Sequence, residues 1–184
     1  DALAADRAAA VCGLLRLSAP PSIADTLLVP IITAFQQAHP GVRVEVLVTD
    51  RYVDHLSEDV DLAFRFGKLR DSTLRVRRLL TYRHRLVASP AYLRDHPPPR
   101  EPEDLHGHRL LAFSYWQAGN QWTLVHATSR SQIRLTVRPA LAMNDFAGLV
   151  TALLAGQGIG ELPPIVAPDL LRRSELVEVM PEWR

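Results

Sequence analysis

The densest group of side chains that could do chemistry lies in residues 50–67, which read DRYVDHLSEDVDLAFRFG. Carboxylates and imidazoles bind metals and transfer protons, and this stretch places Asp54, His55 and Glu58 within five positions. The spacing of His55 and Glu58 would allow two ligands on one helix face, but such a pair is an unspecific signal. We therefore interpret Asp54, His55 and Glu58 as the solvated face of a short helix over 51–58, followed by Asp59 in a turn.

Other patterns for catalysis or metal binding are weaker. His106 and His108 flank a glycine in a predicted loop, and Cys12 lies in a predicted linker. The chain has no Cys-x-x-Cys, no His-Glu-x-x-His, no calcium loop and no Gly-x-Ser-x-Gly. The GQGIG stretch follows a predicted helix, whereas a phosphate-binding loop precedes one. We expect no catalytic residues, no metal and no cofactor, and hence no enzyme.

The composition is that of a globular domain that does not bind nucleic acid by itself. The 184 residues are 47% hydrophobic and 22% charged, and the formal net charge is +1. Nucleic-acid and membrane surfaces require a concentrated basic excess, so we interpret the five arginines between Arg75 and Arg85 as solvated residues on crossing strands. No apolar run reaches the roughly 18 residues of a membrane span. The single cysteine fits a reducing compartment such as the cytoplasm.

The first part of the chain predicts alternating strands and helices. A strand from Leu14 leads into a helix with Ser22 at its N-cap, Asp25 in a variant capping box and a bend at Pro30. The alternating apolar residues of 42–48 predict a half-covered strand, and 60–67 predicts a buried parallel strand that ends at Gly67. This order predicts two βαβ units over a parallel sheet.

The second part predicts shorter elements. A helix should begin at Ser89-Pro90, and a second helix should run from a polar cap near Asn144 to a stop at Gly156 or Gly158. Short strands are predicted at 109–114, 121–125, 133–137, 140–143 and 158–163, and a last one in LVEVMPEWR. The chain is therefore predicted to be α/β throughout.

Polar residues gather where these elements meet. Open α/β sheets bind ligands at the carboxyl ends of their strands, and helix N-termini attract anions. Each such residue could equally be a helix cap, because Ser, Asn and Asp favour that position. As a set they predict a cleft, and its members are Ser22, Thr49, Arg65, Ser114, Asn144 and Asp145.

Five stretches, in order and at the expected spacing, resemble the effector-binding domain of LysR-type transcriptional regulators. They are LLRLSAPPSIADTLLVPII with a following Phe, the run from HPGVRVEV to RVRRL, RLVASPAYL, DLHGHRLLAF and MNDFAGLVTALLAGQGIGELP. The resemblance implies two Rossmann-like lobes joined by crossover strands, similar to type 2 periplasmic binding proteins. It implies a linker-helix remnant over 1–13, lobe I over 14–84 and lobe II over 85–184, with the return segment of lobe I missing.

The resemblance also implies how the domain would act. A small-molecule effector would lie between the lobes, and its binding would be transmitted to an N-terminal winged helix-turn-helix that contacts DNA and is absent here. The bacterial regulator would form a homodimer, with the lobe I helix and strand 42–48 against lobe II of the partner. By similarity, the effector contacts are Ser22, Ile23, Thr49, Arg65, Phe66, Gly67, Phe113, Ser114, Asn144, Asp145 and Phe146.

Two questions stay open at this stage. Arg65 near two helix N-termini favours a carboxylate or other anion as the effector, but this arginine could instead pair with Asp50 or Asp61. The alternative to a regulator is a solute-binding protein of a transport system, which has the same fold but an export signal. The acidic, alanine-rich start DALAADRAAAV favours the regulator.

Overall fold

The chain folds into two α/β units. The computed structural model describes residues 11–51, 53, 57–67, 74–114 and 120–183. Contacts divide the chain into unit 1, Asp1–Arg75, and unit 2, Val76–Arg184, which are described separately. The predicted linker-helix remnant falls almost wholly on residues 1–10, outside the described part. Among the described residues, no helix is long and apolar enough to cross a membrane.

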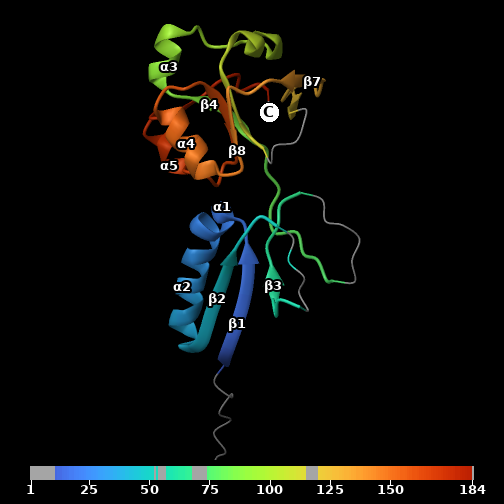
Figure 1. Cartoon of the computed structure of the whole chain (residues 1–184), viewed down its shortest axis with the longest axis vertical. Helices are drawn as coiled ribbons and strands as arrows, with labels where there is room; N and C mark the ends of the chain where they lie inside the picture. Colours follow the sequence, from blue (N-terminus) through green and yellow to red (C-terminus); the bar gives the residue numbers. More distant parts are fainter. Residues whose placement is uncertain (1–10, 52, 54–56, 68–73, 115–119, 184) are drawn as a thin grey trace, which may run out of the picture. The chain divides into compact units, whose positions relative to one another are not determined.

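Unit 1 is built on a parallel sheet in the order β2-β1-β3 (Figure 1). Strand β1, Cys12–Ala19, pairs along its whole length with β2, Gly41–Val48, from Cys12 opposite Gly41 to Ala19 opposite Val48. The side chains of β2 alternate toward and away from the core up to Val46, as the sequence pattern predicted. Strand β3 then joins the other edge of β1.

Strand β3 corrects one prediction. It is parallel to β1 as expected, but it contains only Leu62–Ala63, and Leu62 is 52% exposed. In the described sheet β3 pairs with β1 and has no strand on its other side. The long buried strand predicted up to Gly67 is therefore wrong in both length and burial. The helix predicted over 51–58 lies mostly outside the described residues, and residues 57–59 form a turn.

The helix between β1 and β2 contains a π-helical turn. It consists of α1 at Pro21–Ile23, η1 at Ala24–Leu28 and α2 at Val29–Ala38. In the π-turn the Val29 N–H donates to the Ala24 carbonyl, five residues back, just before Pro30, which can donate no backbone hydrogen bond. Leu28 is buried at the end of the π-turn, whereas Ile31 and Phe35 of the predicted apolar face are exposed, and α2 has no buried residue.

Unit 2 contains a five-stranded mixed sheet in the order β10-β4-β9-β5-β8. Strands β5 and β8 are parallel to each other and β5 is parallel to β9, while β4 runs antiparallel to β9 and β10. A separate antiparallel hairpin is formed by β6 and β7. The strand bounds are β4 Arg85–Ala88, β5 Leu110–Phe113, β6 Asn120–Val125, β7 Gln132–Val137, β8 Leu141–Met143, β9 Ile159–Leu162 and β10 Val177–Glu178.

The predicted crossing strands are shorter than expected. Residues 74–84 are exposed or half-buried and form no strand, and β4 begins only at Arg85. All five arginines between Arg75 and Arg85 are exposed, as the solvated interpretation predicted. The last predicted strand is reduced to the two residues of β10.

The helices of unit 2 begin and end largely where local signals placed them. In α3, Pro90–Asp95, the Ser89 hydroxyl caps the helix by accepting from the Tyr92 N–H. Helix α4, Phe146–Leu154, ends in a Schellman motif, in which Gly156 has φ +73° and the Gln157 N–H reaches the Ala152 carbonyl. Two short helices were not predicted, the 3₁₀-helix η2 at Pro102–Gly107 and α5 at Pro168–Arg172.

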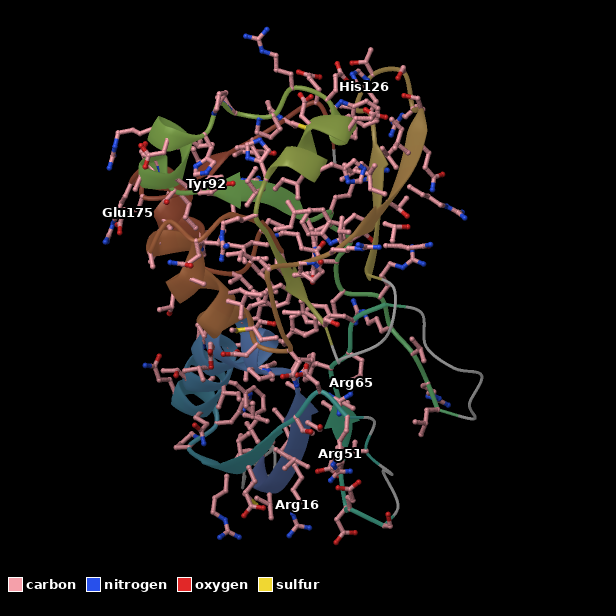
Figure 2. All side chains as sticks on the ribbon, turned by 45° about the horizontal axis from the view of Figure 1, so that its top comes forward. Arg16, Arg51, Arg65, Tyr92, His126 and Glu175 are labelled. Atoms are coloured by element: carbon pink, nitrogen blue, oxygen red, sulfur yellow. The ribbon has the colours of Figure 1, made fainter. Side chains whose placement is uncertain are left out.

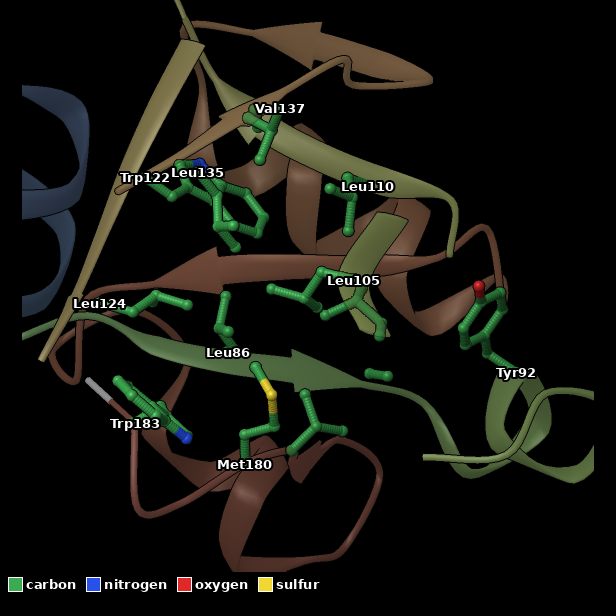
Figure 3. Close-up of a cluster of buried hydrophobic side chains, with 14 residues drawn as sticks. Leu86, Tyr92, Leu105, Leu110, Trp122, Leu124, Leu135, Val137, Met180 and Trp183 are labelled. Carbon is green, nitrogen blue, oxygen red and sulfur yellow. The ribbon is translucent and has the colours of Figure 1, made fainter. Parts of the chain in front are cut away.

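The sheet of unit 2 buries both of its faces. Successive residues of a strand point to opposite faces, so Leu86 and Ala88 join one apolar cluster and Val87 the other. The first cluster lies against the β6–β7 hairpin and η2 (Figure 3) and includes Trp122, Leu124 and Leu105. The second lies against α4 and includes Phe146, Leu149 and Leu153.

Tyr92 connects the first cluster to a pair of histidines. Its hydroxyl lies 3.1 Å from His108 Nδ1 and accepts from the Arg109 N–H, and its ring stacks on His96 at 4.2 Å. Burial lowers the pKa of His108, and the charge of His96 lowers it further, while Asp104 partly opposes both effects. These contacts favour a neutral His108 in the folded chain.

This arrangement predicts a loss of stability in acid that depends on His108. The folded chain takes up the proton of His108 less readily than the unfolded chain, whose histidine titrates near 6.5. The contribution of neutral His108 to the free energy of unfolding is therefore complete above pH 6.5. It decreases as the pH falls from 6.5 toward the lower pKa of the folded chain. In urea unfolding across this range, His108→Asn should show a flatter pH dependence than the parent chain. His106→Asn, at an exposed position two residues away, should keep the parent slope; equal flattening in both variants would contradict the assignment.

Candidate functional site

The carboxyl ends of the three parallel strands of unit 1 meet at one edge of its sheet. The Thr49 N–H, just after β2, donates to the Ala19 carbonyl at 2.8 Å, and the Phe64 N–H, just after β3, donates to the Ser18 carbonyl at 2.7 Å. Thr49 and the Arg65–Gly67 segment, both predicted from the sequence, are thereby brought to the edge that binds ligands in open α/β folds.

Arg65 joins these strand ends through its guanidinium group (Figure 2). Nη2 donates to the Ser18 hydroxyl at 2.7 Å and to the Arg51 carbonyl at 2.8 Å, and Nη1 donates to the Phe64 carbonyl at 2.7 Å. Ser18, the next-to-last residue of β1, is fully buried. The arginine therefore holds together β1, the turn after β2 and its own segment, and it is half-buried.

The start of the helix in unit 1 differs from the prediction. The N-cap is Pro20, whose carbonyl accepts from the N–H groups of Ile23 and Ala24, and Pro21 occupies the first helical position. Ser22 is thus the second helical residue and not the N-cap, and the Ser22 carbonyl accepts from the Thr26 hydroxyl. Proline fixes φ near the helical value, which explains why the helix begins earlier than expected. Ile23 is buried in the core of unit 1.

In unit 2 the predicted residues lie after β5 and β8. The Ser114 N–H donates to the Met143 carbonyl at 3.0 Å, so the ends of these parallel strands are held together. Asp145 is the N-cap of α4 and accepts from the N–H groups of Ala147 and Gly148 at 3.3 and 3.0 Å, which confirms the predicted polar cap. Asn144 is exposed beside it, whereas Ser114 is buried.

Four rings form a row beside these residues. Phe113 stacks on Phe146 with ring centroids 4.4 Å apart, Phe146 meets the edge of His84 at 6.0 Å, and His84 stacks on Tyr82 at 6.0 Å. Burial raises the pKa of Tyr82 to about 12, so its phenol stays neutral. The row connects the segment before β4 to the first turn of α4.

His84 and Glu161 form a hydrogen-bonded pair that no sequence motif indicated. His84 Nδ1 lies 3.0 Å from Glu161 Oε2, although the two residues are 77 positions apart. Glu161 follows two buried residues within β9, and an acid in an otherwise apolar strand was the available signal. The histidine had no distinguishing motif, because its role depends on the pairing of β4 with β9.

The described part of the acidic stretch 50–67 contains no set of side chains that could bind a metal ion. Across the described ranges, no set of three His, Cys, Asp or Glu side chains could hold a metal ion. Glu58 forms a two-point ion pair with Arg51, and Asp61 accepts from the Arg16 N–H at 2.8 Å. Asp54 and His55 lie outside the described residues. Cys12 is exposed at the start of β1.

Two α/β units, each with polar residues just after the carboxyl ends of its parallel strands, define a fold of the periplasmic-binding-protein-like class. Comparison with known proteins gives the family. Residues 8–184 match the model of the LysR substrate binding domain, and the chain belongs to this family.

The similar curated proteins are transcriptional regulators. An HTH-type transcriptional regulator of Haemophilus influenzae is 32% identical over 172 residues, which cover 94% of this chain and 59% of that protein. The HTH-type transcriptional regulator PtxR of Pseudomonas aeruginosa is 30% identical over 172 residues, covering 94% of this chain and 54% of PtxR. The chain thus spans somewhat more than half the length of these relatives.

Solved structures show the same fold. The full-length virulence activator AphB of Vibrio cholerae, a member of the LTTR family, superposes with a TM-score of 0.82 at 28% identity, covering 94% of this chain and 58% of AphB. The regulatory domain of CrgA from Neisseria meningitidis gives a TM-score of 0.80 at 28% identity, covering 92% of this chain and 82% of that domain. The predicted fold class and the predicted family are both confirmed.

The hydrogen bonds of Arg65 predict that it stabilises unit 1. Arg65→Met should lower the stability of unit 1 by about 2 kcal/mol. The substitution removes charge-assisted hydrogen bonds and leaves the buried Ser18 hydroxyl without this donor. Hydrogen exchange of the β1 and β2 amides would measure the loss within unit 1. The control is Arg16→Met, which removes exposed ion pairs with Glu45 and Asp59 that contribute about 0–1 kcal/mol. Equal effects of the two substitutions would contradict the role given to Arg65.

Proposed function

We propose that this chain is the effector-binding domain of a bacterial LysR-type transcriptional regulator. The family match over residues 8–184 carries the proposal. The relatives are HTH-type regulators and are longer than this chain, so DNA contact is assigned to an N-terminal helix-turn-helix domain. The domain would act in the cytoplasm by binding a small molecule without catalysing a reaction. A solute-binding protein of a transporter is less well supported, because the similar curated proteins are regulators.

We assign effector contacts to the carboxyl edge of the sheet in each unit. In unit 1 the proposed contacts are Ser22, Ile23, Thr49 and Arg65 to Gly67, and in unit 2 they are Phe113, Ser114 and Asn144 to Phe146. The gathering of each set at its own sheet edge supports this assignment. Ile23 would contribute through its backbone, since its side chain is buried.

The charge of Arg65 supports a small carboxylate or another anion as the effector. Its guanidinium group is held at the strand ends by Ser18 and by the Arg51 carbonyl, which gives it a defined position. The positive charge of a guanidinium held in this way attracts an anion without loss of the hydrogen bonds that position it. The helix that starts at Pro21 adds its positive dipole end to the same edge.

A thermal-shift screen of small aromatic and aliphatic acids tests the effector assignment, with the neutral amide of each acid as its control. An acid present at a hundred times its dissociation constant should stabilise the chain by about 2.7 kcal/mol. Thr49→Val should remove most of this stabilisation, because it deletes a hydroxyl at the strand end, whereas Thr33→Val on the exposed side of α2 should not. Stabilisation by the neutral amides alone would rule out an anionic effector.

The exposed apolar surface of unit 1 supports a homodimer. Ile31, Ala34, Phe35 and Ala38 form a stripe along α2 at helical spacing, and Ile31 is 60% and Phe35 is 37% exposed. Leu47 and Val48 at the end of β2 are also exposed. We assign α2 and strand residues 42–48 to an interface with lobe II of the partner, because apolar stripes on isolated domains mark interaction surfaces.

The dimer assignment predicts that charged residues on the apolar stripe of α2 make the chain monomeric. The parent chain should sediment as a dimer at tens of micromolar, and the double variant Ile31→Glu, Phe35→Glu should sediment as a monomer, because burying two carboxylates without partners is costly. Gln37→Glu, on another face of the same helix, should remain dimeric. A monomeric parent chain would contradict the assignment.

A further inference from the structure

Glu161 places a carboxylate on the side of the unit 2 sheet that packs against the β6–β7 hairpin. It lies opposite Leu86 in the pairing of β9 with β4, and Leu86 belongs to the apolar cluster on that side (Figure 3). Its neighbours along β9, Gly160 and Leu162, are buried, and the Glu161 side chain is 24% exposed. A partly buried carboxylate is costly without a hydrogen-bonding partner. Glu161 therefore needs a partner, and His84 supplies it.

His84 lies just outside the sheet, because it directly precedes Arg85, the first residue of β4. A carboxylate only accepts hydrogen bonds, so His84 Nδ1–H donates to Glu161 Oε2, at 3.0 Å. A side chain at the end of a strand can reach groups from both faces of the sheet. The His84 ring does so, since Glu161 comes from the hairpin side and Phe146 belongs to the cluster on the α4 side.

The hydrogen bond to Glu161 sets the orientation of the His84 ring. Tyr82 stacks on this ring with an interplanar angle of 13° and ring centroids 6.0 Å apart. Phe146 is nearly perpendicular to it, at 83°, with centroids also 6.0 Å apart. Perpendicular pairs of rings are favourable at this separation, and they depend on the angle between the planes. The orientation of His84 therefore determines how the ring of Phe146 can pack.

Phe146 is the residue at which these contacts reach the proposed effector contacts of unit 2. It is the first residue of α4, directly after the Asp145 N-cap. Its ring stacks on Phe113, the last residue of β5, with centroids 4.4 Å apart and an interplanar angle of 23°. Glu161 is thus connected through His84 to two residues of the effector set without belonging to that set.

We propose that Glu161 is a positioning residue for the unit 2 part of the effector site. Its hydrogen bond orients His84, His84 holds the ring of Phe146, and the ring of Phe146 holds that of Phe113. This role rests on the proposed function, which assigns Phe113 and Phe146 to the effector. Rings held in this way are already ordered when a ligand arrives, which lowers the entropic cost of binding.

Aromatic NMR of the ligand-free 184-residue chain tests this role. The chain has five phenylalanines, so ring-labelled phenylalanine and single Phe→Leu variants can assign the rings of Phe113 and Phe146. In Glu161→Leu the cross-peaks between the His84 and Phe146 rings should be lost. The cross-peaks between Phe146 and Phe113 should weaken, and the ring flips of Phe146 should become faster. Glu161→Gln keeps an acceptor for His84 Nδ1–H and should retain the parent cross-peaks.

Two comparisons separate positioning from a general effect on the fold. In His84→Leu the cross-peaks between Phe113 and Phe146 should weaken as in Glu161→Leu, and the double variant should show no further loss, because the glutamate acts through the histidine. Glu175→Leu makes the same exchange at an exposed position of unit 2 and should leave the ring signals unchanged. Urea unfolding would check that each variant is folded, and Glu161→Ala replaces Glu161→Leu if the latter is not.

Unchanged Phe146 signals in Glu161→Leu would overturn the proposal. Equal losses in Glu161→Gln and Glu161→Leu, a further loss in the double variant, or an equal effect of Glu175→Leu would overturn it as well. No ligand takes part in these measurements, so their outcome does not depend on the effector. A thermal-shift screen in which no compound stabilises the chain would instead count against the proposed function and leave the ring contacts as they are.

Discussion

The burial of both faces of the unit 2 sheet is the constraint on which the rest of that unit depends. Because alternate side chains of a strand point to opposite faces, β4 must supply apolar residues to two separate clusters, which it does with Leu86 and Ala88 on one side and Val87 on the other. Polar side chains are then tolerated only near strand ends. The charged residues of this region, Arg83, Arg85 and Glu161, lie where the sheet meets solvent.

The sheet of unit 1 is smaller than that of unit 2. Its described sheet has three strands, of which β3 contributes two residues, so fewer ladder hydrogen bonds hold its edge. Arg65 compensates by linking the buried Ser18 to the turn after β2. The same guanidinium group therefore supports the fold and presents positive charge at the edge assigned to the effector. A residue with both functions cannot be changed without affecting stability as well as binding.

The arginines of the two units differ in how they are held. At the edge of unit 1, Arg65 is held by several acceptors, and a ligand would meet a preformed group. In unit 2, Arg83 and Arg85 are exposed, and neither forms an ion pair in the described ranges.

The sequence by itself determined those features that depend on residues a few positions apart. The caps at Ser89 and Asp145, the stop at Gly156 and the alternation along β2 all follow from local geometry, and each was predicted. The family was also predictable, because its motifs occur in order along the chain. A local signal failed at Ser22, where the two prolines before it moved the start of the helix.

Only the tertiary structure decided the contacts between distant segments. The 47 positions between Arg65 and Ser18, and the 77 between His84 and Glu161, leave no periodic trace in the sequence. Helical spacing alone did not determine that Leu28 is buried while Ile31 and Phe35 are exposed. Strand pairing and packing bring these groups together, and the geometry of the Arg65 network and of the His84–Glu161 contact follows from that pairing.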